Sequence, residues 1–175
     1  MVEGLIIKES LKVKQGVVVM FVSPDNRVMV FSGDEENNTK TGEMVMGFSQ
    51  GISRSVHGFE LPGGMVKKYE SYEDAIVREV GEEVRFDVNE MVCTGRLRKV
   101  GDEKLLQERS GETSKFDVKI FRMKLSWDEV KAMLDGLLEK KSSKLLSKQE
   151  ISKKSLKYLR ERDRMIFKKY ATILS

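Results

Sequence analysis

The sequence contains only one cysteine, Cys93, and two prolines among its 175 residues. A single cysteine excludes an internal disulfide and favours a reducing, cytoplasmic location. Cys93 lies in an apolar run, which predicts a small buried residue rather than a nucleophile. No apolar run reaches the roughly 18 residues of a membrane span, and the first residues lack the basic and apolar regions of a signal peptide. We therefore expect a cytoplasmic protein with no membrane partner.

Positive charge is concentrated in the last part of the chain. Residues 140–169 carry 12 Lys or Arg and 3 Asp or Glu, a net charge of +9, which leaves −5 on the remainder of a chain whose total is +4. An acidic body with a basic segment suits a protein that handles metal ions and phosphates. Contact with nucleic acid stays open as the weaker interpretation, because a basic patch alone supports only salt-sensitive binding without sequence preference.

The strand signals lie in two groups. Apolar runs at residues 17–22 and 27–31, separated by a Pro-Asp-Asn turn, predict a β-hairpin. Two further strands are expected at residues 91–100 and 116–125. The residues between them, 101–115, are charged and predict a long loop of the kind that is usually functional or mobile.

Helices are expected to start at Ser71, at Ser126 and near Ser152, the first two with capping residues. Strands, one helix, strands and then helices predict an α+β domain, or an α/β/α sandwich with a mixed sheet. We expect residues 1–175 to form one domain in which residues 126–175 are the helical C-terminal part.

Three glutamates, Glu79, Glu82 and Glu83, share one face of the helix expected at residues 71–84. Like charges at this spacing repel one another, so a helix that only needed solubility gains nothing from them. Carboxylate oxygens are the ligands that Mg²⁺ and Mn²⁺ prefer, and these ions often share them with substrate phosphates. Gly63 and Gly64 precede the helix and let the backbone approach a ligand. The pattern therefore predicts a site for a divalent cation and a diphosphate.

The same residues resemble the signature of the Nudix hydrolase family, G-x5-E-x7-R-E-U-x-E-E-x-G-U, where U is a bulky aliphatic residue. Gly64 and Glu70 occupy its first fixed positions, and Arg78 begins the run that fills the rest, so that the match spans 23 residues. Arg85 stands in place of a glycine, and Phe86 is aromatic where an aliphatic residue is usual. So many fixed positions distinguish this match from a short glycine motif. The resemblance implies the Nudix fold, with a box helix and C-terminal helices.

The resemblance also implies a role for each residue of the site. Glu79 and Glu83 would be the principal ligands of Mg²⁺ or Mn²⁺, with Glu82 as a further ligand or an orienter of water. The carbonyl of Gly63 would complete the metal site, and Arg78 would hold the glutamates by pairing with them. The reaction implied is hydrolysis of the diphosphate bond of a nucleoside diphosphate linked to another moiety.

The segment before the signature resembles ADP-ribose and nucleotide-sugar pyrophosphatases, which often carry Glu-Leu-Pro there. This resemblance implies substrate contacts at Glu60, Arg54 and Gly64. A catalytic base often comes from a later loop, and among the acids of residues 101–115 we select Glu112. Nucleoside triphosphates, dinucleotide polyphosphates and capped RNA are the alternative substrates, and an inactive Nudix-fold binding module is the alternative class. Nucleotide-sugar members are commonly homodimers.

Arg85 is the main departure from the family pattern. A glycine at this position would let the chain turn into the left-handed region at the end of the helix. An arginine in that conformation costs on the order of 1 kcal/mol. We therefore expect the helix either to continue past Val84 or to end in a strained turn, with the metal ligands upstream of it unaffected.

Overall fold

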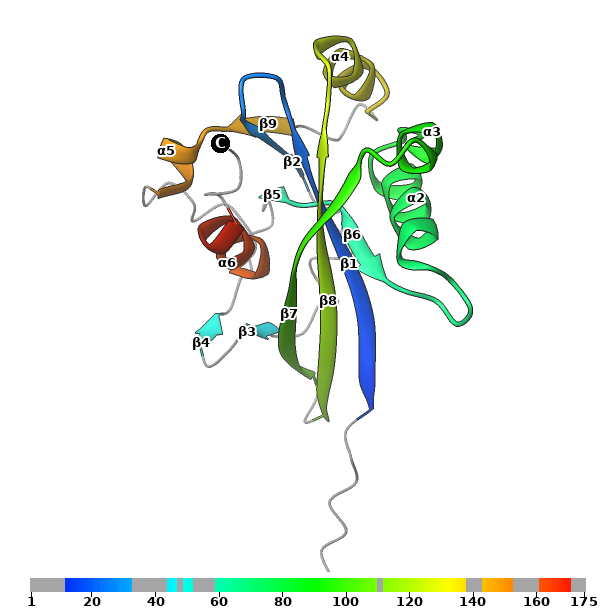
Figure 1. The fold of residues 1–175 in the computed structure, drawn as a ribbon. Helices are drawn as coiled ribbons and strands as arrows, with labels where there is room; N and C mark the ends of the chain where they lie inside the picture. The colour runs from blue at the N-terminus through cyan, green and yellow to red at the C-terminus, as the bar shows by residue number, and fades with distance from the viewer. Residues whose placement is uncertain are drawn as a thin grey trace, which may run out of the picture.

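The computed structural model describes residues 12–32, 44–46, 49–51, 59–109, 112–137, 143–152 and 161–170, and Figure 1 shows their arrangement. The strands are β1 (Val13–Val22), β2 (Val28–Ser32), β3 (Met44–Met46), β4 (Ser49–Gly51), β5 (Phe59–Glu60), β6 (Gly63–Met65), β7 (Leu97–Arg109), β8 (Glu112–Lys124) and β9 (Ser143–Leu146). The helices are α2 (Tyr72–Glu83), α3 (Asn89–Cys93), α4 (Trp127–Asp135), α5 (Lys148–Ser152) and α6 (Glu161–Tyr170). None of these described helices is long and apolar enough to cross a membrane.

The strands form a mixed sheet. Strands β1 and β8 are parallel, whereas β1 and β2, and β7 and β8, pair in the antiparallel sense. The path through the sheet is β4-β3-β7-β8-β1-β2-β5, with β6 added to β1 and β9 added to β2. The α+β class with a mixed sheet and helices, as predicted, is confirmed.

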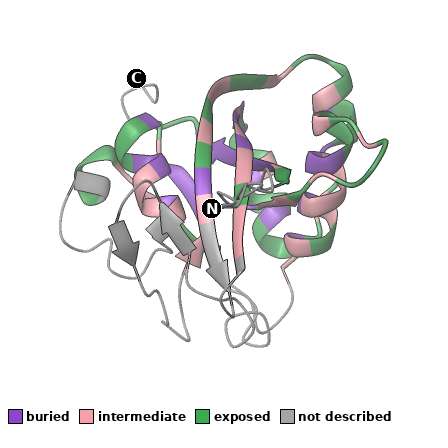
Figure 2. Ribbon diagram, turned by 90° about the horizontal axis from the view of Figure 1, so that it is seen from below, coloured by how far each residue is buried: buried purple, intermediate pink, exposed green. Residues whose placement is uncertain are grey.

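Strand β1 is buried on both faces, and its side chains alternate between two hydrophobic cores. Val18 and Met20 belong to the core that contains Ile166 of α6, whereas Val19 belongs to the core that contains Ile76 of α2. Helices α6 and α2 accordingly cover opposite faces of the sheet (Figure 1), and the buried residues gather where helix meets sheet (Figure 2). A strand covered on both sides reads as a continuous apolar run, which explains the sequence of residues 17–22.

The expected loop at residues 101–115 is wrong, because most of it belongs to a long β-hairpin. Pairing between β7 and β8 runs from Leu97 opposite Met123 to Arg109 opposite Glu112. At Leu105 and Val118 only one face of this hairpin is buried, so charged residues alternate with apolar ones. This alternation makes the strands difficult to recognise in the sequence.

The start of the expected strand at residues 91–100 is also wrong. Residues Asn89–Cys93 form the short helix α3, and β7 begins only at Leu97. Cys93 is exposed rather than buried, because it lies at the end of α3 on the side away from the buried Met91. The apolar run around Cys93 therefore marked one buried side chain rather than a strand.

The C-terminal part is less helical than expected. Strand β9 adds to β2, with Val28 opposite Leu146, before the helices begin. Helix α6 then packs across the sheet, and its last residue docks on β7: the Tyr170 hydroxyl donates to Glu103 Oε1 over 2.6 Å. Gly101 makes room for this contact, because a Cβ there would overlap the ring of Tyr170.

Candidate active site

Helix α2 is a rigid platform for the acidic residues. Ser71 caps it, and the Ser71 side chain accepts a hydrogen bond from the Asp74 amide at 3.0 Å, as the capping pattern predicts. Ile76, Val80 and Val84 recur at a spacing of four residues and form an apolar stripe that is fully buried against β1. The stripe fixes the rotation of the helix and leaves its acidic face to the neighbouring segment 59–65.

The two glycines before the helix meet the two acids predicted as principal metal ligands. The Gly63 amide donates a hydrogen bond to Glu83 Oε2 over 3.0 Å. A Cβ at Gly64 would overlap the carboxylate of Glu79, so only glycine allows this approach. Gly63 itself lies in β6, opposite Val18 of β1. The loop and the helix are thus joined through backbone and carboxylates rather than through apolar contact.

Arg78 joins the acids of the signature to one another. Its guanidinium binds both carboxylate oxygens of Glu70, at 2.7 and 3.0 Å, and donates to Glu79 Oε1 over 2.6 Å. A weaker ion pair of 3.6 Å reaches Glu82, whose side chain is 60% exposed. The bidentate contact with Arg78 lowers the pKa of Glu70 to about 2. Glu70 also accepts the Lys67 amide over 2.8 Å and so ties the loop to the helix.

Glu83 lies in the opposite environment. Burial raises the pKa of Glu83 to about 8, and the negative charges of Glu60 and Glu79 add to this effect. The hydrogen bond from Gly63 and the positive charge of Arg162 oppose it. A desolvated carboxylate beside two further acids is a place where a cation would be strongly stabilised.

The donors suit a hard divalent cation, since Glu79, Glu82 and Glu83 offer only carboxylate oxygens. Within the described ranges, however, no three His, Cys, Asp or Glu side chains converge as a ready-formed metal cluster. Glu79 is turned to Arg78, and Glu83 to the Gly63 amide. The repulsion among the acids is therefore relieved by Arg78 and by backbone, and a cation would have to draw the carboxylates together.

The remaining predicted site residues fall in three places. Glu60 lies close enough to Glu83 for its charge to raise the pKa of that group. Arg54 lies outside the described residues. Glu112 begins β8, and eight residues separate it from Ile120, which lies opposite Val18. A strand of that length spans about 26 Å, so the structure does not bring Glu112 to the level of the Gly63 loop.

Two functional candidates were missed by the sequence reasoning, and both come from α6. Arg162 and Asp163 form an ion pair of 2.7 Å, with the Asp163 side chain fully buried. Burial acts to lower the pKa of Arg162, but Asp163, Glu60 and Glu83 outweigh it and raise that pKa. The only signal in the sequence is an acid enclosed by basic residues, Arg-Asp-Arg, inside the segment with net charge +9.

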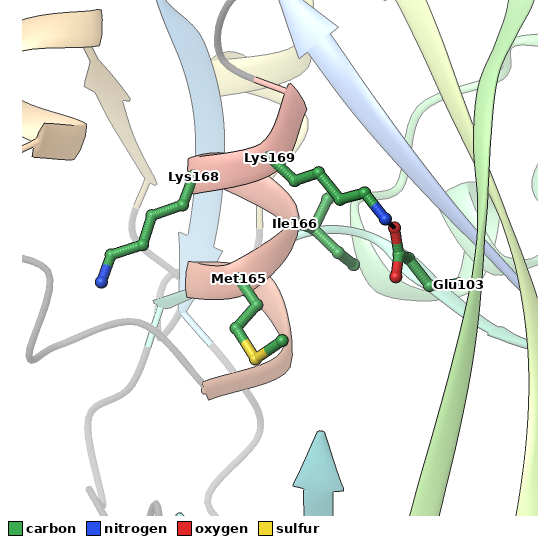
Figure 3. Close-up of a pocket in the computed structure, with 5 residues that line it drawn as sticks. All are labelled: Glu103, Met165, Ile166, Lys168 and Lys169. Atoms are coloured by element: carbon green, nitrogen blue, oxygen red, sulfur yellow. Dashed lines mark ion pairs between the residues drawn. The ribbon is translucent and has the colours of Figure 1, made fainter. Parts of the chain in front are cut away.

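A pocket of about 340 Å³ lies between α6 and β7, near the ion pair of Arg162 and Asp163. Met165, Ile166 and Lys168 line it from the helix. Figure 3 shows Lys169 and Glu103 pointing toward one another across it, with an ion pair of 2.5 Å, whereas Lys168 points away. Met165 and Ile166 follow Arg162 by one helical turn, so the pocket begins roughly 5 Å along α6 from Arg162.

Helix α2 ends as one of the two expected alternatives. Its last helical residue is Glu83, Val84 is the C-cap, and Arg85 has φ 60°, in the left-handed region. The expectation of a strained turn is confirmed, and the extension of the helix beyond Val84 is not observed. The metal-ligand candidates all lie before this turn.

Comparison with known proteins identifies relatives of this architecture. A model of the NUDIX domain family matches residues 18–153. An Ap4A hydrolase from C. elegans is similar over 94% of this chain and 100% of that chain, with 15% identity and a TM-score of 0.53. A MutT protein from Methanosarcina mazei Go1 is similar over 94% and 96% of the two chains, with 13% identity and a TM-score of 0.55.

A third similar structure is the E. coli dihydroneopterin triphosphate pyrophosphohydrolase, over 93% of this chain and 99% of that chain, with 13% identity and a TM-score of 0.56. A search of the curated proteins finds no match to this sequence. At these identities the three structures show a common fold and do not identify a substrate.

Proposed function

Because the chain belongs to the Nudix family of hydrolases, we propose that it cleaves the diphosphate bond of a nucleoside diphosphate linked to another moiety. Members of this family are pyrophosphohydrolases and generally use divalent ions such as Mg²⁺ or Mn²⁺. The observation that carries the proposal is the Glu83 carboxylate, which is half-buried near Glu60 and Glu79 and accepts a hydrogen bond from the Gly63 amide. This arrangement supports a cation and a diphosphate better than it supports an inactive binding module.

Each residue of the candidate site would have its own role in hydrolysis. Glu79, Glu82 and Glu83 would hold Mg²⁺ or Mn²⁺, which when bound supplies charge neutralisation for the diphosphate and lowers the pKa of water. Arg78 keeps Glu79 oriented, through the 2.6 Å contact, and stays anchored itself by Glu70. Glu82, exposed at the surface of the helix, orients water on the open side.

The diphosphate would lie along the glycine loop. Because the Glu79 carboxylate fills the space beside Gly64, the diphosphate would reach the loop through the cation that Glu79 and Glu83 would hold. Without a cation, burial raises the pKa of Glu83 to about 8, and a bound cation would lower that pKa because it stabilises the charged carboxylate. Because the backbone of Glu112 lies about 26 Å along β8 from the level of the Gly63 loop, we propose that the base is one of the acids of the signature instead.

ADP-ribose or a nucleotide sugar is the substrate class we propose first. We propose that Glu60 of the Glu-Leu-Pro segment contacts the substrate, and the effect of its charge on Glu83 supports this. A carboxylate accepts hydrogen bonds from ribose or sugar hydroxyls. A dinucleotide polyphosphate or a nucleoside triphosphate is the second class, since structures of similar fold are named as an Ap4A hydrolase and a dihydroneopterin triphosphate pyrophosphohydrolase. A homodimer is proposed with the first class and is tested by light scattering.

The test is a panel of ADP-ribose, nucleotide sugars, nucleoside triphosphates, dinucleotide polyphosphates and capped RNA, with Mg²⁺ or Mn²⁺. We expect release of a nucleoside monophosphate from one class, and a loss on the order of 1,000-fold in Glu83→Gln because several kcal/mol of charge stabilisation disappear. Glu73→Gln, an exposed acid on the same helix, is the matched control. Binding of ADP-ribose without any hydrolysis across the panel would favour the inactive module instead.

A further inference from the structure

Side chains at the start of helix α6 form hydrogen bonds with the backbone just before the glycine loop. The Leu61 amide donates to Asp163 Oδ2, and Arg162 Nη2 donates to the Leu61 carbonyl, each over 3.3 Å. Arg162 Nε also donates to Asp163 Oδ1 over 2.7 Å. The side chains of Arg162 and Asp163 and the backbone of Leu61 therefore form a closed ring of hydrogen bonds. Both polar groups of Leu61 are therefore fixed from a helix that lies 101 residues later in the chain.

Burial makes this ion pair informative. The Asp163 side chain is 0% exposed and that of Arg162 is 11% exposed. A buried ion pair contributes little net stability compared with apolar side chains of the same volume. Apolar residues would serve simply to pack α6 on the sheet, as Ile166 and Phe167 do. The pair therefore points to a role beyond packing.

The backbone after Leu61 connects these hydrogen bonds to Glu83, one of the candidate metal ligands. Immediately after Leu61, the Pro62 carbonyl accepts a hydrogen bond from Val19 over 2.9 Å. The next residue, Gly63, donates its amide to Glu83 Oε2 over 3.0 Å. Every step from α6 to the Glu83 carboxylate is thus a hydrogen bond or a peptide bond, with no flexible side chain of unfixed orientation between them.

We propose that Arg162 and Asp163 are positioning residues for the site of the proposed function, which hold Leu61 so that the Gly63 amide fixes the carboxylate of Glu83. This proposal rests on that function. The charges agree with it, because Arg162 lies near enough to Glu60 and Glu83 to interact with both, while Asp163 balances Arg162. A group that orients a metal ligand typically changes metal affinity about 10–100-fold when it is lost.

The direct test is Mn²⁺ binding, measured by titration calorimetry on the purified full chain without substrate. Asp163→Asn removes a negative charge and weakens the acceptor for Leu61, and both effects weaken Mn²⁺ binding, by about tenfold. Asp128→Asn removes the same charge from an exposed position on α4 and should leave the affinity unchanged. Equal affinities in folded Asp163→Asn and wild type would overturn the proposal.

A second comparison separates positioning from the mere docking of α6. Glu103→Gln weakens the contacts of Glu103 with Tyr170 and Lys169 at the other end of this helix. We expect it to lower the melting temperature but to leave Mn²⁺ affinity unchanged. If Glu103→Gln weakens Mn²⁺ binding as much as Asp163→Asn does, general loosening of α6 explains the effect and the proposal fails.

Arg162→Lys provides a variant that keeps the charge if Asp163→Asn does not fold. Lysine cannot contact Asp163 and the Leu61 carbonyl with the fixed fork of arginine. We expect faster hydrogen exchange of the Gly63 amide and weaker Mn²⁺ binding in this variant, and unchanged exchange would contradict the proposal. Should the wild type itself neither bind Mn²⁺ nor hydrolyse any substrate, the proposed function fails, which is a different result from equal binding in wild type and variants.

Discussion

Glu70 and Glu83 lie in the same 23-residue signature, yet their surroundings shift their pKa values in opposite directions. Arg78 binds both oxygens of Glu70 and lowers its pKa to about 2, whereas burial beside other acids raises the pKa of Glu83 to about 8. One carboxylate is satisfied by the protein and stabilises it. The other is left with a charge that the protein accommodates poorly. Glu70 therefore joins the loop to the helix, whereas Glu83 is an acid that we propose as a metal ligand.

The largest effect that would test this comparison is the pH dependence contributed by Glu83. Its pKa rises from 4.5 unfolded to about 8 folded, so the folded state holds the extra proton. The contribution of Glu83 to the free energy of unfolding is full below pH 4.5 and is lost as the pH rises through 8, by a few kcal/mol. Urea unfolding of metal-free wild type and Glu83→Gln should show the variant gaining relative stability from pH 5 to 9.

Addition of Mn²⁺ should reverse this trend for wild type only, because the ion stabilises the charged form of Glu83 and binds the folded state. A stability difference between the two proteins that stays constant with pH would mean that Glu83 is ionised without penalty. The contrast with Glu70 would then disappear.

A smaller effect of opposite sign is expected for Glu70. Its pKa falls from 4.5 unfolded to about 2 folded, so its contribution is present above pH 4.5 and is lost as the pH falls toward 2. Glu70→Gln should cost about 2 kcal/mol at pH 7, because charge-assisted hydrogen bonds to Arg78 are lost. The difference from wild type should shrink at pH 3, and Glu73→Gln, at an exposed position in the first turn, should cost less than about 1 kcal/mol at pH 7.

The smallest effect concerns the turn after the helix that carries Glu83. Arg85 has φ 60°, and Arg85→Gly should stabilise the protein by about 0.5–1 kcal/mol, since the left-handed penalty exceeds the entropy cost of glycine. Asn26 has the same φ of 60°, but asparagine tolerates this region better, so Asn26→Gly should gain less. A destabilised Arg85→Gly, measured by thermal unfolding, would show that the arginine is not strained.

Local patterns were sufficient for the parts of the fold that depend on neighbours in sequence. The hairpin of β1 and β2, the cap at Ser71 and the apolar stripe of α2 follow from turn residues and periodicity. The β7–β8 hairpin escaped notice because one of its faces is charged and solvent-exposed, so residues 101–115 resemble a loop. Cys93 was assigned to a core because an apolar run does not distinguish a strand from a short helix.

The candidate site likewise has a part that the sequence predicts and a part that it does not. Spacing alone places Glu79 and Glu83 on one helix, and the family signature names their partners. It does not show that the Gly63 amide donates to Glu83, or that burial raises the pKa of that carboxylate. Nor does any local pattern reveal the contact between Asp163 and Leu61, which are 102 residues apart. Contacts of that separation depend on the whole topology rather than on periodicity.

The position of α6 about 100 residues after Leu61 has a consequence for synthesis. Strand β1 pairs in parallel with β8, with Val13 opposite Lys115, so the central sheet needs partners about 100 residues apart and should close slowly. Even after the sheet closes, Leu61 lacks its hydrogen bonds to residues 162 and 163 until these two residues have left the ribosome. A nascent chain would therefore carry the complete signature for some time without a finished site, and its maturation would follow the synthesis of α6.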